Sequence, residues 1–129
     1  MEQTTVVKTP FDLIGGLEVV REIVDGFYDL LERDASYAAL RALHAPDLAP
    51  MRASLTGFLA AWLGGPRNWF EDHPGLCMMS AHRDVQMTAE TGRQWAGAMT
   101  RAIQASSVEP GLGAKMAGAL ADLATRMAQ

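Results

Sequence analysis

The spacing of apolar residues between positions 17 and 33 constrains the fold of this chain most. Apolar side chains recur there at steps of three and four residues, at Val20, Ile23, Val24, Phe27, Tyr28 and Leu31. This spacing places them on one face of an amphipathic helix. No stretch of the sequence alternates apolar and polar residues for long enough to indicate a strand. We therefore predict an all-α fold.

Threonine and proline mark where further helices begin, because threonine caps a helix N-terminus and proline suits the first helical position. The starts predicted in this way are Thr9-Pro10, Ala49-Pro50, Thr88 and Glu109-Pro110, and a further short helical piece begins at Ser36. Gly15-Gly16 interrupts the first helix, and the piece from Ser36 runs to Leu43. Gly64-Gly65-Pro66 ends the helix from Ala49, because proline cannot continue a helix and glycine favours the left-handed cap.

Three of these helices carry apolar faces that we expect to pack inward. The face of the helix from Ala49 holds Met51, Leu55, Phe58, Leu59 and Trp62. The helix from Thr88 to about Ala105 carries inward Trp95, Met99, Ala102 and Ile103. The last helix has on one side Leu112, Met116, Leu120, Leu123 and Met127. We predict a flexible leader over residues 1–9 and one domain over residues 10–129, irregular over 67–87 except for a short helical stretch around Leu76 to His82.

Composition narrows the partners and the compartment. A formal charge of −4 and a pI near 5.2 argue against nucleic acid or an anionic membrane as a partner. The single cysteine, Cys77, cannot form an internal disulfide, which favours a reducing compartment. No apolar run approaches the roughly 18 residues of a spanning helix, and the N-terminus lacks a signal segment. We expect a cytoplasmic protein.

His82 is the candidate metal ligand. A neutral imidazole binds iron, and a haem needs only one protein ligand to keep its sixth position open for a gas. Tyr28 and Trp95 offer O–H and N–H donors to an oxygen ligand, whose negative charge donors stabilise in a dry site. Taken singly, each residue has a plainer interpretation: a surface histidine, a core tyrosine whose hydroxyl reaches a backbone carbonyl, and a large core indole.

His44, just before Ala45-Pro46, has three interpretations: a solvated turn residue, a donor in a pocket, or a sixth iron ligand. Other chemistries have less support. One cysteine and three widely spaced histidines do not make a zinc site. Gly64-Gly65-Pro66 lacks the lysine of a phosphate-binding loop, and no serine stands in a Gly-x-Ser-x-Gly context.

Several short motifs follow one another between Pro10 and Met127. They are Leu13-Ile14-Gly15-Gly16, Phe27-Tyr28, Leu40 to His44, Phe58 to Pro66, His73-Pro74, His82 and Gln94-Trp95. Their order, with the spacing from His82 to Trp95, resembles the truncated, two-over-two haemoglobins, and within them the second group. A tryptophan in the helix that carries Trp95 is the hallmark of that group.

The resemblance implies a two-over-two helical sandwich, a haem b (iron protoporphyrin IX) and His82 as the proximal iron ligand. It implies a distal pocket shaped by Tyr28, His44, Leu55 and Trp95, with Met51 at the gate of the pocket. Further expected contacts to the haem are Phe58, Arg67 and Trp69, and a guanidinium such as that of Arg67 matches a haem propionate.

Three features depart from the family pattern. His44 stands where many globins have phenylalanine or tyrosine. The stretch from His73 to His82 is about two residues longer than usual. Ala81 replaces an arginine that often meets a propionate in this group, which leaves Arg67 and Arg83 as substitutes.

These observations favour a five-coordinate haem protein that binds oxygen, NO and CO. Two or three donors around the ligand would slow oxygen release, which suits nitric oxide dioxygenation or peroxide turnover better than transport. Such a cycle needs an external reductase, since the chain offers no flavin- or nicotinamide-binding domain. We expect a monomer or weak homodimer. The alternatives are a six-coordinate haem for electron transfer or sensing, with His44 or Met51 as sixth ligand, and a helical binding module without a cofactor.

Overall fold

The computed structural model describes residues 9–44, 46–65 and 88–127, and this part of the chain is helical and contains no strand. The helices are α1 (Pro10–Ile14), α2 (Leu17–Arg33), the 3-10 helix η1 (Ala35–Tyr37), α3 (Ala38–Ala42), α4 (Ala49–Trp62), α7 (Ala89–Ala105) and α8 (Pro110–Met127). The all-α prediction is confirmed. The predicted stretch around Leu76 to His82 and the leader before Thr9 lie outside the described residues.

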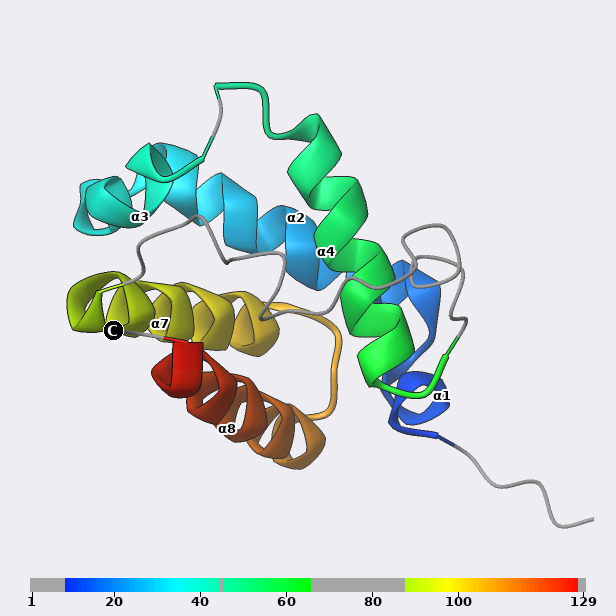
Figure 1. Ribbon diagram of the computed structural model, residues 1–129. Coiled ribbons are helices and arrows are strands. Elements are labelled where there is room, and N and C mark those ends of the chain that lie inside the picture. The colour runs from blue at the N-terminus through cyan, green and yellow to red at the C-terminus, as the bar shows by residue number, and fades with distance from the viewer. Residues whose placement is uncertain (1–8, 45, 66–87, 128–129) are drawn as a thin grey trace, which may run out of the picture.

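Helix α2 is central to the fold (Figure 1), because it packs against both α4 and α7. Helix α7 in turn packs against α8, so α2 with α4 and α7 with α8 form two pairs. This is the expected sandwich of two helices over two. Among the described residues, no helix is long and apolar enough to cross a membrane.

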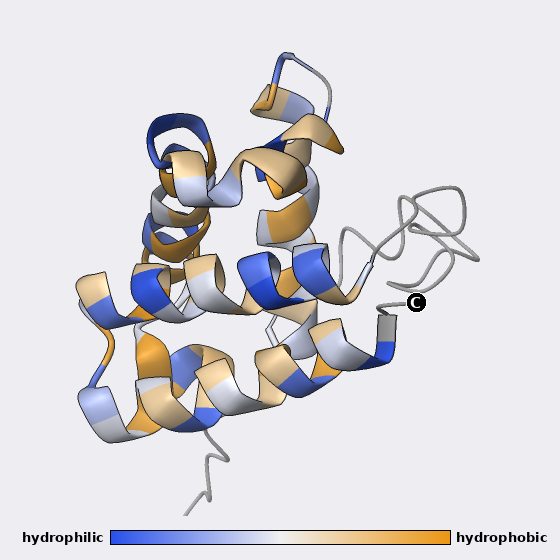
Figure 2. Ribbon diagram, turned by 90° about the vertical axis from the view of Figure 1, so that its left-hand side faces the viewer, coloured by the Kyte–Doolittle hydropathy of each residue, from blue (hydrophilic) through white to orange (hydrophobic). Residues whose placement is uncertain are grey.

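The core forms where the predicted faces meet. All six apolar positions predicted on α2 are buried, as are the four predicted on α7. Bands of apolar and polar residues alternate along the helices (Figure 2), as expected of amphipathic elements. In α8, Met116 and Leu120 are buried, while Leu112 and Leu123 are partly buried at the edge of the core. Burial of these faces is the main term that stabilises the sandwich.

The predicted helix ends have the expected capping contacts. Thr9 and Thr88 each accept a hydrogen bond from the backbone N–H three residues on, as capping residues do. At the end of α4, Gly64 adopts φ of +91°, and the N–H groups of Gly64 and Gly65 donate to the carbonyls of Ala61 and Ala60. This is a Schellman motif, in which the left-handed residue is almost always glycine because it has no Cβ.

The second glycine of that pair makes room for α1. The backbone N–H of Phe11 donates to the carbonyl of Leu63 at 2.9 Å, so α1 docks on the end of α4. A Cβ added at Gly65 would lie 2.6 Å from the ring of Phe11, too close for any side chain. Gly64-Gly65 therefore ends one helix and receives another.

Two predictions about helices need correction. Met51 and Trp62 were expected on the inward face of α4, but they are 36% and 37% exposed. In the first turn of α4 it is Arg52 that faces α2, through ion pairs to three of its residues. Helix α4 crosses α2 rather than running along it (Figure 1), so α2 covers only part of the surface of α4.

The helical piece expected from Ser36 to Leu43 is divided into η1 and α3. The carboxylate of Asp34 accepts a hydrogen bond from the Ser36 N–H at 2.9 Å and pairs with Arg101 on α7 at 2.8 Å. The hydrogen bond from Arg101, together with those from Ser36, lowers the pKa of Asp34 to about 2. This polar contact starts the tight turn that separates α2 from α3.

Candidate functional site

Tyr28 and Trp95, predicted from distant parts of the sequence, meet around Phe27. The ring centroids of Phe27 and Tyr28 lie 4.9 Å apart in an edge-to-face arrangement. The ring of Phe27 also lies 5.6 Å from that of Trp95, across the contact between α2 and α7. The helix pairing therefore places both predicted donor residues beside the ring of Phe27.

Both donors are buried and lack acceptors within the described structure. Tyr28 is 3% exposed and Trp95 is 6% exposed. Within residues 9–44, 46–65 and 88–127, neither the Tyr28 hydroxyl nor the Trp95 indole N–H donates a hydrogen bond. Buried donors are normally satisfied, since an unmade hydrogen bond costs about 1–3 kcal/mol. Two such groups fit a site whose ligand carries the acceptor, as a gas bound to haem iron does.

Burial also changes the acidity of Tyr28. Desolvation raises the pKa of its hydroxyl to about 12, and the positive charge of Arg52 offsets part of this rise. A tyrosine hydroxyl is protonated at neutral pH even without this rise, so it is available as a donor. Its acceptor in the plain interpretation, a backbone carbonyl, is not found among the described residues.

His44 follows α3, and its imidazole lies edge-on to Tyr28 with ring centroids 5.7 Å apart. Its Nδ1 lies 3.0 Å from the carbonyl oxygen of Leu40. Because a carbonyl only accepts, Nδ1 carries the proton in this contact, and Nε2 of the neutral ring is an acceptor. The neutral imidazole is therefore no donor through Nε2, which counts against His44 as a third donor to a gas.

Gln94 holds the segment that carries His44. Its Oε1 accepts from the backbone N–H of Leu40 at 3.0 Å, and its Nε2 donates to Glu90 at 2.9 Å. Leu40 is thus hydrogen-bonded through its N–H to α7 and through its carbonyl to His44. Gln94, the residue before Trp95 in the sequence, therefore holds Leu40 in place, and through Leu40 it positions His44 beside Tyr28.

Helix α4 contributes an apolar wall. Leu55 and Phe58, both predicted in the pocket, are buried on this helix. Met51, the predicted gate residue, lies one turn before Leu55 and is partly exposed. An exposed apolar residue beside a buried one is consistent with a position at the mouth of a pocket.

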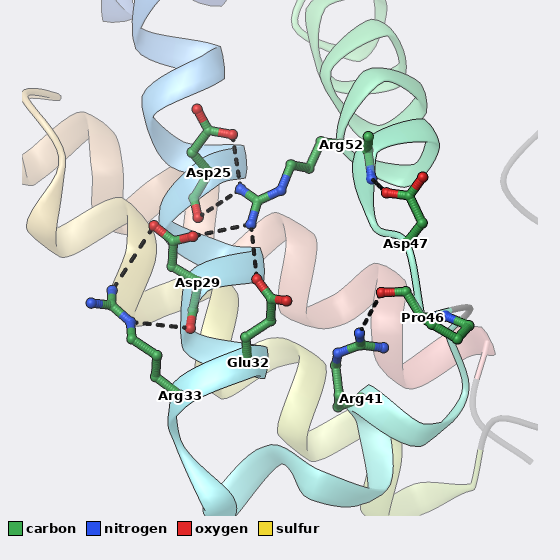
Figure 3. A network of polar contacts seen from close by, with 9 residues as sticks. Asp25, Asp29, Glu32, Arg33, Arg41, Pro46, Asp47 and Arg52 are labelled. Carbon is green, nitrogen blue, oxygen red and sulfur yellow. Dashed lines mark hydrogen bonds and ion pairs between the residues drawn. The ribbon is translucent and has the colours of Figure 1, made fainter.

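A network of charged residues joins α4 to α2 (Figure 3), and its arginine lies over the ring of Tyr28. Arg52 of α4 pairs with Asp25, Asp29 and Glu32 of α2 at 3.0, 3.0 and 3.3 Å. Its guanidinium carbon lies 5.6 Å from the centroid of the Tyr28 ring. Burial alone lowers the pKa of Arg52, but the hydrogen bonds and charges of Asp29 and Asp25 raise it above the usual value. Arg52 is therefore a cation held between a buried ring and three carboxylates.

The remaining predicted residues fall in the undescribed part of the chain. The proximal ligand His82, the haem contacts Arg67 and Trp69, and the propionate candidate Arg83 lie outside the described residues. Their roles stay predictions. Within the described part, no three histidine, cysteine, aspartate or glutamate side chains gather in a way that could hold a metal ion.

Two residues of the site were not singled out for a role on the sequence alone. Arg52 and Gln94 act through partners that are distant in the chain, at separations of 20–27 and 54 residues. The sequence does contain one signal for Arg52. Asp25, Asp29 and Glu32 are spaced four and three positions apart, so their carboxylates form one stripe along α2 that calls for a basic partner. Nothing local indicated which basic residue faces that stripe.

Comparisons with known proteins place most of this chain in one protein family. A model of the bacterial-like globins matches residues 9–129. The chain is 30% identical over 100 residues to the group 2 truncated haemoglobin YjbI of Bacillus subtilis. The matched residues make up 78% of this chain and 73% of that protein.

Solved structures show the same fold. The cold-adapted truncated haemoglobin of Pseudoalteromonas haloplanktis TAC125 has a TM-score of 0.89 at 25% identity, covering 95% of this chain and 98% of that one. The group II 2-on-2 haemoglobin of Agrobacterium tumefaciens has a TM-score of 0.91, covering 98% of both chains. At 24% identity, the second likeness concerns the fold alone.

Proposed function

Since this chain belongs to the bacterial-like globins and, among them, to the group II truncated haemoglobins, we propose that it binds oxygen, NO and CO reversibly at a five-coordinate haem b. Membership of the family implies a haem cofactor and the binding of a gas. When bound, the haem supplies an iron with one coordination position open to a diatomic molecule. The observation that carries the proposal is the pair of buried, unsatisfied donors on Tyr28 and Trp95.

In this proposal the residues of the distal side have distinct roles. Tyr28 and Trp95 donate hydrogen bonds to the gas, and Leu55 and Phe58 keep water away from it. A hydrogen bond to a charged acceptor contributes roughly 1.5–3 kcal/mol, so two of them slow the release of oxygen strongly. Slow release favours reaction of oxygen with NO, or peroxide turnover, over transport, and such a cycle draws electrons from an external reductase.

On the opposite side we propose His82 as the iron ligand, with Arg67 and Trp69 as further contacts to the haem. A neutral imidazole is the usual proximal ligand of a gas-binding haem. This assignment rests on the motif order that the chain shares with its family, and the next experiment tests it directly.

The test is the absorption spectrum of haem-reconstituted protein in the ferric, reduced and CO-bound states, beside the same series for His82→Gly. We expect a Soret band that shifts with CO in the wild type and loss of proximal ligation in the variant. A wild type that retains no haem would refute the proposal. A variant with unchanged spectra would refute the assignment of His82 alone.

A second candidate function is a six-coordinate haem for electron transfer or redox sensing, with His44 as the sixth ligand. The contact from Nδ1 to the Leu40 carbonyl favours it, since metal-binding histidines typically donate their other N–H to such a group. A ferric spectrum that is low-spin without added ligand, and that becomes high-spin in His44→Phe, would establish this function. A high-spin wild-type spectrum would exclude it.

A further inference from the structure

Arg52 is placed unusually for a cation. It lies in the first turn of α4, where the helix dipole disfavours positive charge. Its side chain is only 26% exposed, although each of its three carboxylate partners is 45% exposed or more. A partly buried guanidinium at an unfavourable helix end requires compensation, and the stripe formed by Asp25, Asp29 and Glu32 on α2 supplies it.

The geometry of this group is matched to Arg52. One terminal nitrogen reaches Asp25, both its carboxylate and its backbone carbonyl, while the other reaches Asp29 and Glu32. These contacts use several donors of the planar fork at once and so fix the plane of the guanidinium (Figure 3). A lysine at this position keeps the charge but has a single nitrogen, so it cannot fix a plane above the ring as the fork does.

The fixed guanidinium lies over Tyr28. The distance of 5.6 Å from its carbon to the ring centroid is within the range of a cation–π contact, which favours the aromatic ring beneath the cation. Tyr28 is in sequence directly before Asp29, one of the residues that hold the guanidinium. The ring is therefore confined between Arg52 on one side and Phe27 and His44 on others.

We propose that Arg52 is a positioning residue, which holds the Tyr28 ring in the orientation from which its hydroxyl meets the gas. The part of this proposal that concerns the gas rests on the proposed function. The part that concerns the orientation of the Tyr28 ring does not depend on it. Arg52 sets the strength of the Tyr28 hydrogen bond without touching the ligand. In this way the charged surface between α2 and α4 tunes the release of oxygen.

The experiment compares oxygen dissociation rates of Arg52→Gln, Arg52→Lys and the control Arg33→Gln, each also in a Tyr28→Phe background. Arg33 is a matched control, because it also pairs with Asp29, at 3.9 Å, but is 77% exposed. We expect Arg52→Gln to release oxygen about three- to tenfold faster, and Arg33→Gln to behave as the wild type. Arg52→Lys should be more stable to heat than Arg52→Gln, because it keeps the positive charge. It should still release oxygen faster than the wild type, because it lacks the planar guanidinium that orients the ring.

The decisive result is the double variant. If Arg52 acts through Tyr28, Arg52→Gln has no further effect once Tyr28 is phenylalanine, since coupled changes are not additive. An equal acceleration in both backgrounds overturns the proposal and indicates a structural role or a role at the entrance. A rate in Arg52→Gln equal to that of the wild type also overturns it.

A second measurement separates this inference from the proposed function. The chain has two tyrosines, so ¹³C labelling of the ring carbon that bears the hydroxyl gives two NMR signals, and Tyr28→Phe assigns them. We expect the Tyr28 signal to shift in Arg52→Gln and the Tyr37 signal to stay. If the protein takes up no haem, the proposed function fails, and this signal still decides whether Arg52 positions the ring. An unmoved Tyr28 signal overturns the inference.

Discussion

At the scale of single residues, the site depends on two donors whose hydrogen bonds are left for a ligand. Tyr28 is surrounded by rings on the inside and by a guanidinium on the outside. This environment excludes water and keeps the hydroxyl protonated, since the charged form of a buried phenol is poorly solvated. The exclusion of water strengthens a hydrogen bond to a ligand that gains negative charge.

Replacing Tyr28 with phenylalanine should therefore speed the release of oxygen. The loss of one hydrogen bond of roughly 1.5–3 kcal/mol corresponds to an increase of about 10- to 100-fold in the dissociation rate. Stopped-flow displacement of oxygen by CO measures the rate directly. Trp95→Phe is the companion variant, and unchanged rates in both would show that these groups do not contact the gas.

The acidity of Tyr28 predicts a pH dependence of stability. Because the folded state holds the Tyr28 proton up to a pKa of about 12, whereas the unfolded phenol ionises near 10, the unfolded state loses its proton first. The contribution of Tyr28 is thus complete below pH 10 and declines as the pH rises from 10 to 12, by about 2 kcal/mol. Urea unfolding at pH 9 and pH 11.5 should show a smaller decline for Tyr28→Phe than for the wild type. Equal declines would contradict the raised pKa.

At the scale of helices, the sandwich depends on how closely the elements approach at particular positions. Gly26 of α2 faces Ala102 of α7, and a Cβ added there would lie 3.6 Å from the Ala102 Cβ, an ordinary contact. Gly65, at the junction of α4 and α1, has no such space, because the Phe11 ring would lie 2.6 Å away. The same chemical change should therefore act in opposite directions at the two sites.

We expect Gly26→Ala to stabilise the protein by about 0.5–1 kcal/mol, since glycine within a helix is unfavourable and the methyl group fits. Gly65→Ala should destabilise it, because the base of the Phe11 ring or the backbone must move. Urea denaturation of the two variants beside the wild type measures both effects. A loss of stability in Gly26→Ala would mean that α2 and α7 pack more closely than described.

At the scale of the whole molecule, the candidate site joins helices from both pairs of the sandwich. Tyr28 lies on α2, Leu55 on α4 and Trp95 on α7, so a group bound among them would link the two pairs. A ligand that binds only the folded state stabilises it by mass action, by about 4 kcal/mol at a thousand times its dissociation constant. Haem should therefore stabilise the assembly of helices as a whole.

Calorimetry should accordingly show a thermal midpoint for the haem-loaded protein that is higher by on the order of 10 °C than for the haem-free protein. Haem added to His82→Gly should raise the midpoint less, since the proposed iron ligand is lost. Equal midpoints for loaded and haem-free wild type would show that haem does not bind preferentially to the folded state.

Much of the fold follows from local signals in the sequence. The inward face of α2 and the capping residues Thr9 and Thr88 were predictable because helix periodicity and capping involve residues only three or four positions apart. The motif order around Phe27-Tyr28 and Gln94-Trp95 likewise indicated the family, and the hydroxyl and indole N–H of Tyr28 and Trp95 already marked them as possible donors. His82, Arg67 and Trp69 remain predictions, since they lie outside the described residues.

The contacts that depend on how the helices cross could be identified only from the tertiary structure. The exposure of Met51, the second role of Gly65 and the contact of His44 with Leu40 depend on neighbours that helical periodicity does not identify. Arg52 is the clearest case: a cation is unfavourable in the first turn of a helix, and only the crossing of α4 over α2 brings it to the three carboxylates and the tyrosine ring that compensate. Local periodicity specifies which face of a helix is apolar, whereas the partner of each side chain depends on the packing angle between helices, which no single segment contains.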